Sequence, residues 1–355
     1  MMTAENASLS LLSIISLLSF FTFLLISKYS KNIGNGILLD HDFDKPQAFH
    51  SVSVARSGGL AAIISFSIFF LLNFFMFEIV YFDYFFLSFT MFFLGFIEDV
   101  KFEIKPIYRL ISMIFFLLLF IIYFSVKINY IDLNFLNIWF QNKIFSVFFV
   151  LICFLFIING ANLIDGFNGL LAIHALIINS ILLFINLENN NEQLAVMITT
   201  QIVILVSFLL FNFPKATLFL GDSGSYLFGS LIALNIIQTN NLIPDISSFF
   251  FCILLFYLFF EVFFSFFRKI FLRRSPLKPD RQHLHMLSYL YLDKSQKFKD
   301  ANYLNSLIIN SIYVTLIIPA LFFKDNGLIC KYWFFSLLIL YTVFYYLLYS
   351  FEKKQ

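Results

Sequence analysis

Runs of apolar residues, each about as long as a membrane-crossing helix, dominate this sequence. Two of the longest cover residues 8–27 and 249–267. A helix of about 20 apolar residues crosses a hydrocarbon core, whereas a buried strand is much shorter. Charged residues make up only 12% of the chain, and a soluble domain has about a quarter. The sequence therefore predicts a polytopic integral membrane protein.

The apolar runs predict an all-α helical bundle with about eleven transmembrane helices. We find no internal repeat and no low-complexity linker between them, so residues 1–355 are predicted to form a single transmembrane domain. The expected spans are roughly 8–27, 59–77, 79–97, 107–126, 144–161, 169–187, 194–212, 224–238, 247–267, 303–323 and 331–351.

Lysine and arginine are distributed unevenly between the two sides of this bundle. If the N-terminus lies outside, 19 of the 23 basic residues fall on the inner side, and the other four are Lys127, Lys143, Lys324 and Lys331. Cytoplasmic loops carry the excess of basic residues, so the inner side is predicted to face the cytoplasm. The first helix is expected to be retained, because no basic residue precedes it.

The polar segments that stand out as candidates for function all fall on the inner side. They are residues 45–59, 95–109, 159–170, 212–225 and 268–286, whereas the Asn-rich segment 186–193 is read as a plain outer loop. A polytopic transporter, the alternative from another class, would instead place polar groups near the middle of the membrane in both halves. The one-sided distribution favours an enzyme with its active site on the cytoplasmic face.

Four carboxylates mark the ends of spans on that face: Glu98, Asp99, Asp165 and Asp222. Any one of them is more simply explained as a helix cap, but four on one face call for a cation. Oxygen ligands without matching Cys or His suit a hard ion, so Mg²⁺ is expected and Mn²⁺ is an alternative.

Glycine-rich turns and a basic loop complete the inner face. The turns in "NGANLIDGFNGL" and "GDSGS" open apolar runs, where backbone N–H groups bind phosphate oxygens. The basic loop precedes His283 and His285, which contact with anionic lipid alone would not require. A net charge of +2 gives no reason to expect a nucleic-acid partner. Together these features indicate phosphoryl transfer between a soluble nucleotide donor and a lipid acceptor.

Four motifs in order then identify a family resemblance. "GFIEDV", "NGANLIDGFNGL", "FLGDSGS" and "RRSPLKPDRQHLHM" resemble the signatures of the polyprenyl-phosphate N-acetylhexosamine-1-phosphate transferases. The resemblance runs from about residue 45 to 286. It implies a Mg²⁺-dependent enzyme of the bacterial inner membrane that transfers a sugar-1-phosphate from a UDP-sugar to undecaprenyl phosphate and releases UMP.

The resemblance also implies a pathway. "FHSVSVARSGG" and "HLHM" look more like the branch that initiates cell-surface glycans such as lipopolysaccharide O-antigen. The muramyl-pentapeptide phosphotransferases of peptidoglycan synthesis remain an alternative, although their basic first loop and triple histidine are absent. A CDP-alcohol phosphotransferase is a weaker alternative, because "DGFNGLLAIHA" lacks that family's Ala-Arg and later paired aspartates. The sequence leaves open which sugar is used and whether the protein forms a homodimer.

The resemblance assigns roles to the carboxylates. It implies that Asp222 binds the metal, that Asp99 is the second member of an acidic pair and a further metal ligand, and that Glu98 is the first member of that pair. An acid of this pair is expected to orient or deprotonate the lipid phosphate. Asp165 matches the first Asp of a DGxDG motif near the nucleotide.

Substrate-binding residues follow from the same motifs. His283 and His285 match histidines of a loop that holds phosphates, with Lys278 and Arg281 beside them, while Asn162 and Asn168 are expected to bind the donor. Three positions depart from the family pattern. Glu98 and Asn168 each stand where an Asp is usual, and Met286 stands where a third His is usual.

Overall fold

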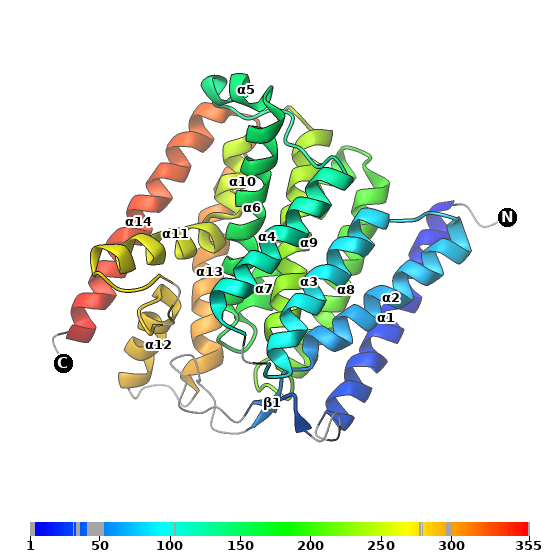
Figure 1. Ribbon diagram of the computed structural model, residues 1–355, viewed down its shortest axis with the longest axis horizontal. Helices are drawn as coiled ribbons and strands as arrows, with labels where there is room; N and C mark the ends of the chain where they lie inside the picture. The colour runs from blue at the N-terminus through cyan, green and yellow to red at the C-terminus, as the bar shows by residue number, and fades with distance from the viewer. Residues whose placement is uncertain are drawn as a thin grey trace.

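The protein is a bundle of long helices, and most of the helix axes are roughly aligned with one another (Figure 1). The computed structural model describes residues 4–30, 32, 36–40, 53–102, 104–276, 278, 280–295 and 300–353. The elements are α1 (Ala4–Tyr29), β1 (Leu39–Asp40), β2 (Val54–Ala55), α2 (Gly58–Phe77), α3 (Phe82–Asp99), α4 (Pro106–Tyr123), α5 (Asn134–Phe140), α6 (Lys143–Ile164), α7 (Leu170–Glu188), α8 (Glu192–Asn212), α9 (Gly221–Leu242), α10 (Ser248–Leu254), α11 (Phe256–Phe271), α12 (Leu284–Lys294), α13 (Ala301–Leu321) and α14 (Gly327–Lys353). The predicted all-α polytopic class is confirmed.

Fewer helices qualify as membrane spans than the sequence predicted. Among the described helices, eight are long and apolar enough to cross a membrane, and the bent pair α10–α11 would be a ninth. The predicted count of about eleven is not confirmed, because α3 and α9 are too polar to qualify. Helix α3 contains Asp83, Glu98 and Asp99, and α9 begins with Asp222 between glycines.

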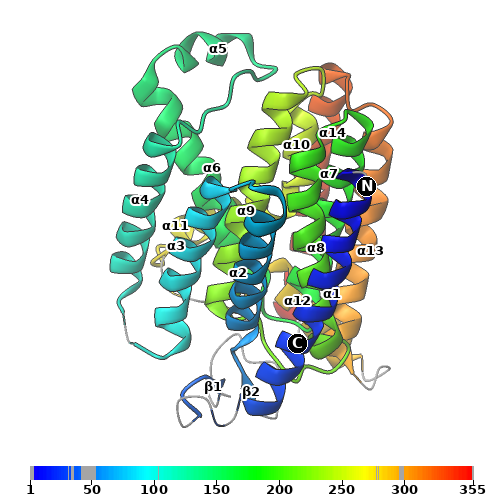
Figure 2. The ribbon, with the colours of Figure 1, turned by 90° about the vertical axis from the view of Figure 1, so that its right-hand side faces the viewer.

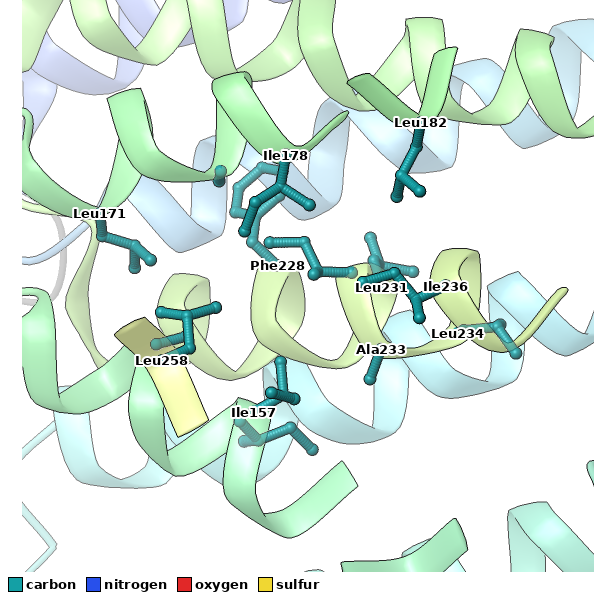
Figure 3. Close-up of a cluster of buried hydrophobic side chains, with 14 of the residues drawn as sticks. Ile157, Leu171, Ile178, Leu182, Phe228, Leu231, Ala233, Leu234, Ile236 and Leu258 are labelled. Carbon is teal, nitrogen blue, oxygen red and sulfur yellow. The ribbon is translucent and has the colours of Figure 1, made fainter. Parts of the chain in front are cut away.

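Helix α9 is polar and lies inside the bundle. It packs against α2, α3, α6, α7 and α8, and nearly all of its residues are buried. Figure 3 shows Phe228, Leu231 and Leu234 of α9 among side chains of neighbouring helices. A helix shielded from lipid needs no continuous apolar surface, so its Ser and Asn side chains form hydrogen bonds with other helices instead.

The predicted span at 247–267 is not one straight helix, because the structure divides it into α10 and α11. The chain bends by 74° between α10 and α11, and α11 crosses the direction of the other helices (Figure 1). The physical reason lies in its composition. Glu261, Ser265 and Lys269 recur once per turn and are buried, whereas Phe263 and Phe267 on other faces are exposed. The polar stripe is therefore turned into the protein.

A short hairpin closes the end of the bundle near Asp222. Strands β1 and β2 pair antiparallel, and β2 continues through a parallel bridge from Ala55 to Leu218. Figure 2 shows the hairpin below α2 and beside the lower end of α1. The sequence did not predict these strands or the short helices α5 and α12. Of the predicted polar segment 45–59, residues 45–52 lie outside the described residues.

Candidate active site

Asp222 begins α9, and Asp99 at the end of α3 holds it in place. One oxygen of the Asp99 carboxylate accepts a hydrogen bond from the backbone N–H of Asp222 at 2.9 Å. The other accepts from the N–H of Ser223 at 2.9 Å and from its hydroxyl at 2.5 Å. The N–H groups at the start of a helix have no partner within the helix, so Asp99 caps α9 from a neighbouring helix. Asp99 is only 1% exposed.

Two glycines make this capping contact possible. Gly221 has a φ of +77°, and a Cβ there would lie 2.6 Å from the Asp99 carboxylate. Gly95 on α3 faces the same turn, where a Cβ would lie 2.4 Å from the Asp222 backbone. Side chains at either position would push α3 and α9 apart. Gly221, which lies in a turn that the sequence suggested for phosphate binding, therefore serves close helix packing together with Gly95.

Arg109 connects Glu98 to Asp222. Its guanidinium lies 3.6 Å from the Glu98 carboxylate and 3.7 Å from the Asp222 carboxylate. Arg109 comes from the first turn of α4, and the sequence analysis did not select it. Arg109 stands at the end of the polar segment 95–109, which is the only indication of its role in the sequence. The sequence alone does not show which residue of that segment contacts the acids.

Arg56 is a second cation that the sequence analysis did not select. Its guanidinium donates to Asp40 at 2.7 and 2.9 Å across the hairpin. Burial alone would lower the pKa of Arg56, but the charges of Asp222, Asp40 and Asp99 outweigh burial and raise it above its ordinary value. Backbone bonds from Gly58 to Phe219 and from Phe219 to Ala55 attach this segment to the chain just before Asp222.

Asp165 follows α6 and is influenced by the same charges. The pKa of Asp165 is raised to about 8, mainly by burial and next by the nearby Asp222 carboxylate. The positive charge of Arg56 acts in the opposite direction. Three carboxylates that repel one another, Asp99, Asp165 and Asp222, are thus collected at one end of the bundle. The structure brings together acids that lie far apart in the sequence, and their repulsion would be relieved by a bound cation.

The turn after Asp165 is held by amide side chains. The side chain of Asn168 donates to the carbonyl of Pro214 at 2.9 Å, and its backbone N–H donates to Asn302 at 2.8 Å. Nearby, Asn212 accepts from the N–H of Gly169 at 2.6 Å. Asn162 accepts from the hydroxyl of Ser225 on α9 at 3.0 Å. Asn168 therefore joins the turn to neighbouring segments, and Asn162 joins α6 to α9. Both asparagines were predicted to bind the donor.

His283 lies between two carboxylates. Its Nδ1 is 3.0 Å from Glu261 and its Nε2 is 3.3 Å from Asp280, and the side chain is 2% exposed. Glu261 also accepts from the Tyr341 hydroxyl at 2.6 Å. Arg268 pairs with Asp280 at 3.0 Å from the other side. These contacts brace the basic loop against α11 and α14.

His285 is buried next to the Asp165 turn. Its ring is 5.9 Å from that of Phe167 and stacks on His283 at 5.6 Å. Burial lowers the pKa of His285 to about 4, so it is neutral at neutral pH. Its Nδ1 lies 3.3 Å from the Tyr257 hydroxyl, and its Nε2 has no hydrogen-bond partner among the described residues. Lys278 and Arg281 are exposed.

The donor set fits a divalent cation that is shared with a substrate. Within the described ranges, no group of three His, Cys, Asp or Glu side chains is arranged to hold a metal alone. Mg²⁺ commonly takes only one or two carboxylates and completes its shell with phosphate and water. Asp222, with a side chain that is 21% exposed and flanked by Glu98, offers such a partial site.

Comparison with known proteins identifies the central part of the chain. Residues 81–240 match the model of glycosyl transferase family 4. The matched segment contains Glu98, Asp99, Asp165 and Asp222, so the acids gathered by the fold all lie in the part of the chain that is similar to this family. Arg56 and His283 lie outside it.

Three proteins that are similar to this chain are all named as transferases. The chain is 33% identical over 146 residues to an undecaprenyl-phosphate alpha-N-acetylglucosaminyl 1-phosphate transferase of Thermotoga maritima, covering 41% of this chain and 44% of that protein. It is 33% identical over 148 residues to a phospho-N-acetylmuramoyl-pentapeptide-transferase of Dictyoglomus turgidum, covering 39% and 47%. A protein of the same name from Leuconostoc mesenteroides is 41% identical over 76 residues, covering 21% and 24%. The chain spans less than half the length of each of these relatives.

Proposed function

We propose that the protein transfers a sugar-1-phosphate from a UDP-sugar to undecaprenyl phosphate. The observation that carries this proposal is the start of α9, where Asp222 is capped by Asp99 and lies beside Arg109 and Glu98. This arrangement presents an acid and a cation together at one end of a membrane bundle. The name of the Thermotoga maritima relative, which includes undecaprenyl phosphate, supports a lipid-phosphate acceptor.

The proposed reaction is a displacement at phosphorus. A phosphate oxygen of the lipid attacks the phosphorus that carries the sugar. The bond from that phosphorus to the bridging oxygen of the diphosphate breaks, and UMP leaves with the electron pair. The lipid phosphate is already an anion at neutral pH, because its second pKa is near 6. A strong base is therefore not needed, and Glu98 has only to orient the nucleophile.

Asp222 is proposed as the direct metal ligand, with Mg²⁺ or Mn²⁺ as the ion. When bound there, the ion would neutralise charge on the diphosphate and favour departure of UMP. Asp99 was predicted from the resemblance to bind the metal as well. Its three hydrogen bonds to the start of α9 favour a different task, which is to hold Asp222 in position. Arg109 and Arg56 supply further positive charge for phosphate oxygens.

The remaining substrate contacts stay predictions. Asn162, Asn168 and Asp165 lie around the turn that would receive the nucleotide, and Lys278 and Arg281 are exposed on the basic loop near His285. The neutral His285, with its unpartnered nitrogen, is better placed to hydrogen-bond a phosphate than His283, which is held between Glu261 and Asp280. A homodimer is not required by any of these contacts.

The test is a donor panel with purified protein in detergent. Undecaprenyl phosphate, Mg²⁺ and one labelled UDP-sugar at a time are mixed, and label in the lipid extract is measured. UDP-N-acetylglucosamine is the expected donor, and chelation of the metal should abolish transfer. Failure of every UDP-sugar to label the lipid would contradict the proposal.

One second candidate is a muramyl-pentapeptide phosphotransferase, favoured by the names of two of the relatives. The panel therefore includes the UDP-linked muramyl pentapeptide. Exclusive use of this donor would place the enzyme in peptidoglycan synthesis rather than in another cell-surface glycan pathway such as that of O-antigen.

The site is proposed to face the cytoplasm of a bacterial inner membrane, on the basis of the uneven distribution of basic residues. A reporter active only outside the cytoplasm is fused after Asn190, between α7 and α8, or after Asp280 in the basic loop. The first fusion should give signal and the second should not. The reverse pattern would contradict the orientation.

A further inference from the structure

Tyr226 carries a buried hydroxyl that neither the fold nor the proposed chemistry accounts for. It lies on α9 one helical turn after Asp222, so the two side chains occupy the same side of the helix. Tyr226 is 0% exposed. Its hydroxyl has no hydrogen-bond partner among the residues that the structure describes. An unsatisfied buried hydroxyl is unfavourable, so a partner is expected in some state of the protein.

Neighbouring polar groups on the same helix are satisfied. Ser223 donates to Asp99, Ser225 to Asn162, and Ser230 to the carbonyl of Leu227. Tyr226 therefore differs from the residues around it. This chain has 55 Phe and 17 Tyr, so Phe is its usual buried aromatic residue. A tyrosine at position 226 is therefore unusual in this chain. A Phe there would leave no polar atom unpaired.

The hydroxyl is buried within range of several charged groups. The charges that act on it are those of Asp222, Arg109, Glu98 and Asp99. By contrast, Phe228, two residues later and about 200° around the helix, points into the apolar cluster of Figure 3. Tyr226 is thus on the side of α9 that carries Asp222, within range of the charges of Arg109 and the two acids that Arg109 pairs with.

We propose that the Tyr226 hydroxyl is a phosphate-binding group, which donates a hydrogen bond to a phosphoryl oxygen of substrate bound at Asp222 and Arg109. A phosphoryl oxygen is an anionic acceptor and would satisfy the hydroxyl that the ligand-free protein leaves unpaired. Two ligands share this chemistry, the diphosphate of the nucleotide and the phosphate of the lipid. The inference rests on the proposed function and names one more residue that recognises its substrate.

The test compares Tyr226→Phe with a matched control, Tyr84→Phe. Tyr84 is also buried, on α3, but its hydroxyl has hydrogen-bond partners, since it lies 2.8 Å from the side-chain oxygens of both Asn235 and Gln238 in the second half of α9. Thermal unfolding is measured for each purified protein without ligand. Tyr226→Phe should keep or slightly raise the melting temperature, because it removes only an unpaired group, whereas Tyr84→Phe should lower it.

Ligand affinity is then measured with Mg²⁺ present, using two pairs of probes. One pair is UDP and uridine, and the other is undecaprenyl phosphate and undecaprenol. Tyr226→Phe should bind UDP, undecaprenyl phosphate or both about tenfold more weakly, as expected for loss of one hydrogen bond to a charged group. It should bind uridine and undecaprenol as the wild type does. Tyr84→Phe should leave all four affinities unchanged.

The phosphate ligand that loses affinity identifies which substrate Tyr226 contacts. Wild-type affinity of Tyr226→Phe for both phosphate ligands would overturn the inference and leave the proposed function intact. A melting temperature for Tyr226→Phe that falls as far as that of Tyr84→Phe would also overturn it, since the hydroxyl would then be structural. If the wild type binds neither UDP nor undecaprenyl phosphate, the proposed function fails as well.

Discussion

The two halves of α9 bury polar groups in different ways. At its start, charged residues from four segments meet: Asp222, Asp99, Glu98, Arg109 and, through the hairpin, Arg56. Farther along the helix, the polar side chains of α9 itself are neutral. Asn235 donates to Gln201 at 2.8 Å and to Asn179 at 3.2 Å, and accepts from Tyr84.

The neutral half largely satisfies its hydrogen bonds within the protein. Gln238 donates to Asp83 at 2.9 Å, and Asn186 of α7 donates to Thr239 at 2.9 Å. Hydrogen bonds between membrane helices each contribute about 1 kcal/mol and fix which helices pack together. This half therefore joins α3, α7 and α8 to α9.

The charged half remains incompletely satisfied. Burial, together with repulsion from the neighbouring acids, raises the pKa of Asp165 to about 8, and the Tyr226 hydroxyl is unpaired among the described residues. The difference teaches that burial of polar groups alone does not mark a site in a membrane protein. Unbalanced charge and buried polar groups without hydrogen-bond partners do mark a site, because a ligand can supply the missing charge or partner.

The largest expected effect is at Asp222. Asp222→Ala should lower the rate of sugar-1-phosphate transfer on the order of 100-fold or more, because an electrostatic contribution of several kcal/mol is lost. Asp222→Asn should do no better, since the amide carries no charge. Initial rates with saturating Mg²⁺ are the measurement. Near-normal rates in either variant would show that the acid is not a metal ligand.

Asp99→Asn should affect both stability and activity. The amide can accept through one oxygen only, so at least one N–H at the start of α9 loses its charged partner. We expect a loss of stability of about 1.5–3 kcal/mol together with reduced transfer. Thermal unfolding and transfer rates measured on the same preparation test this. Reduced transfer without any loss of stability would instead favour Asp99 as a direct metal ligand.

Asn235→Leu should show the opposite pattern from Asp222→Ala. It removes hydrogen bonds to Gln201 and Tyr84 in the neutral half, and a loss of about 1 kcal/mol in stability is expected. Transfer by the folded protein should stay within about twofold of the wild type, since the change lies far along α9 from the acids. A large loss of transfer at normal stability would contradict the division of α9 into two halves.

The smallest expected effect is at Asn168. The sequence alone favours tolerance of Asn168→Asp, because an Asp is usual there in the resembling family. In the structure the amide donates to the carbonyl of Pro214, a bond that a carboxylate cannot make. We expect KM for the UDP-sugar to rise about threefold, within the range for one partly exposed hydrogen bond. An unchanged KM would mean that the bond to Pro214 does not position the turn.

Much of this arrangement could be predicted from the sequence, because long apolar runs and ordered motifs are local signals. Asp222 and Asp165 were selected as span-end acids, and the structure brings them to one end of the bundle. Arg109 and Arg56 were not selected, since their importance depends on contacts with residues far away in the chain. The bend at α11 was not predicted, because Glu261 and Lys269 stand within an overwhelmingly apolar run. Only the structure shows that both lie on one buried face of the helix. His283 was expected to hold phosphates, but sequence cannot show that Glu261 and Asp280 enclose it.

The identity of the released nucleotide tests the central claim most directly. Purified protein, undecaprenyl phosphate, Mg²⁺ and the UDP-sugar that it uses are incubated, and the soluble products are separated. Phosphoryl transfer at Asp222 predicts UMP, formed only when the lipid phosphate is present and lost in Asp222→Asn. Release of UDP, or of UMP without the lipid phosphate, would contradict the account.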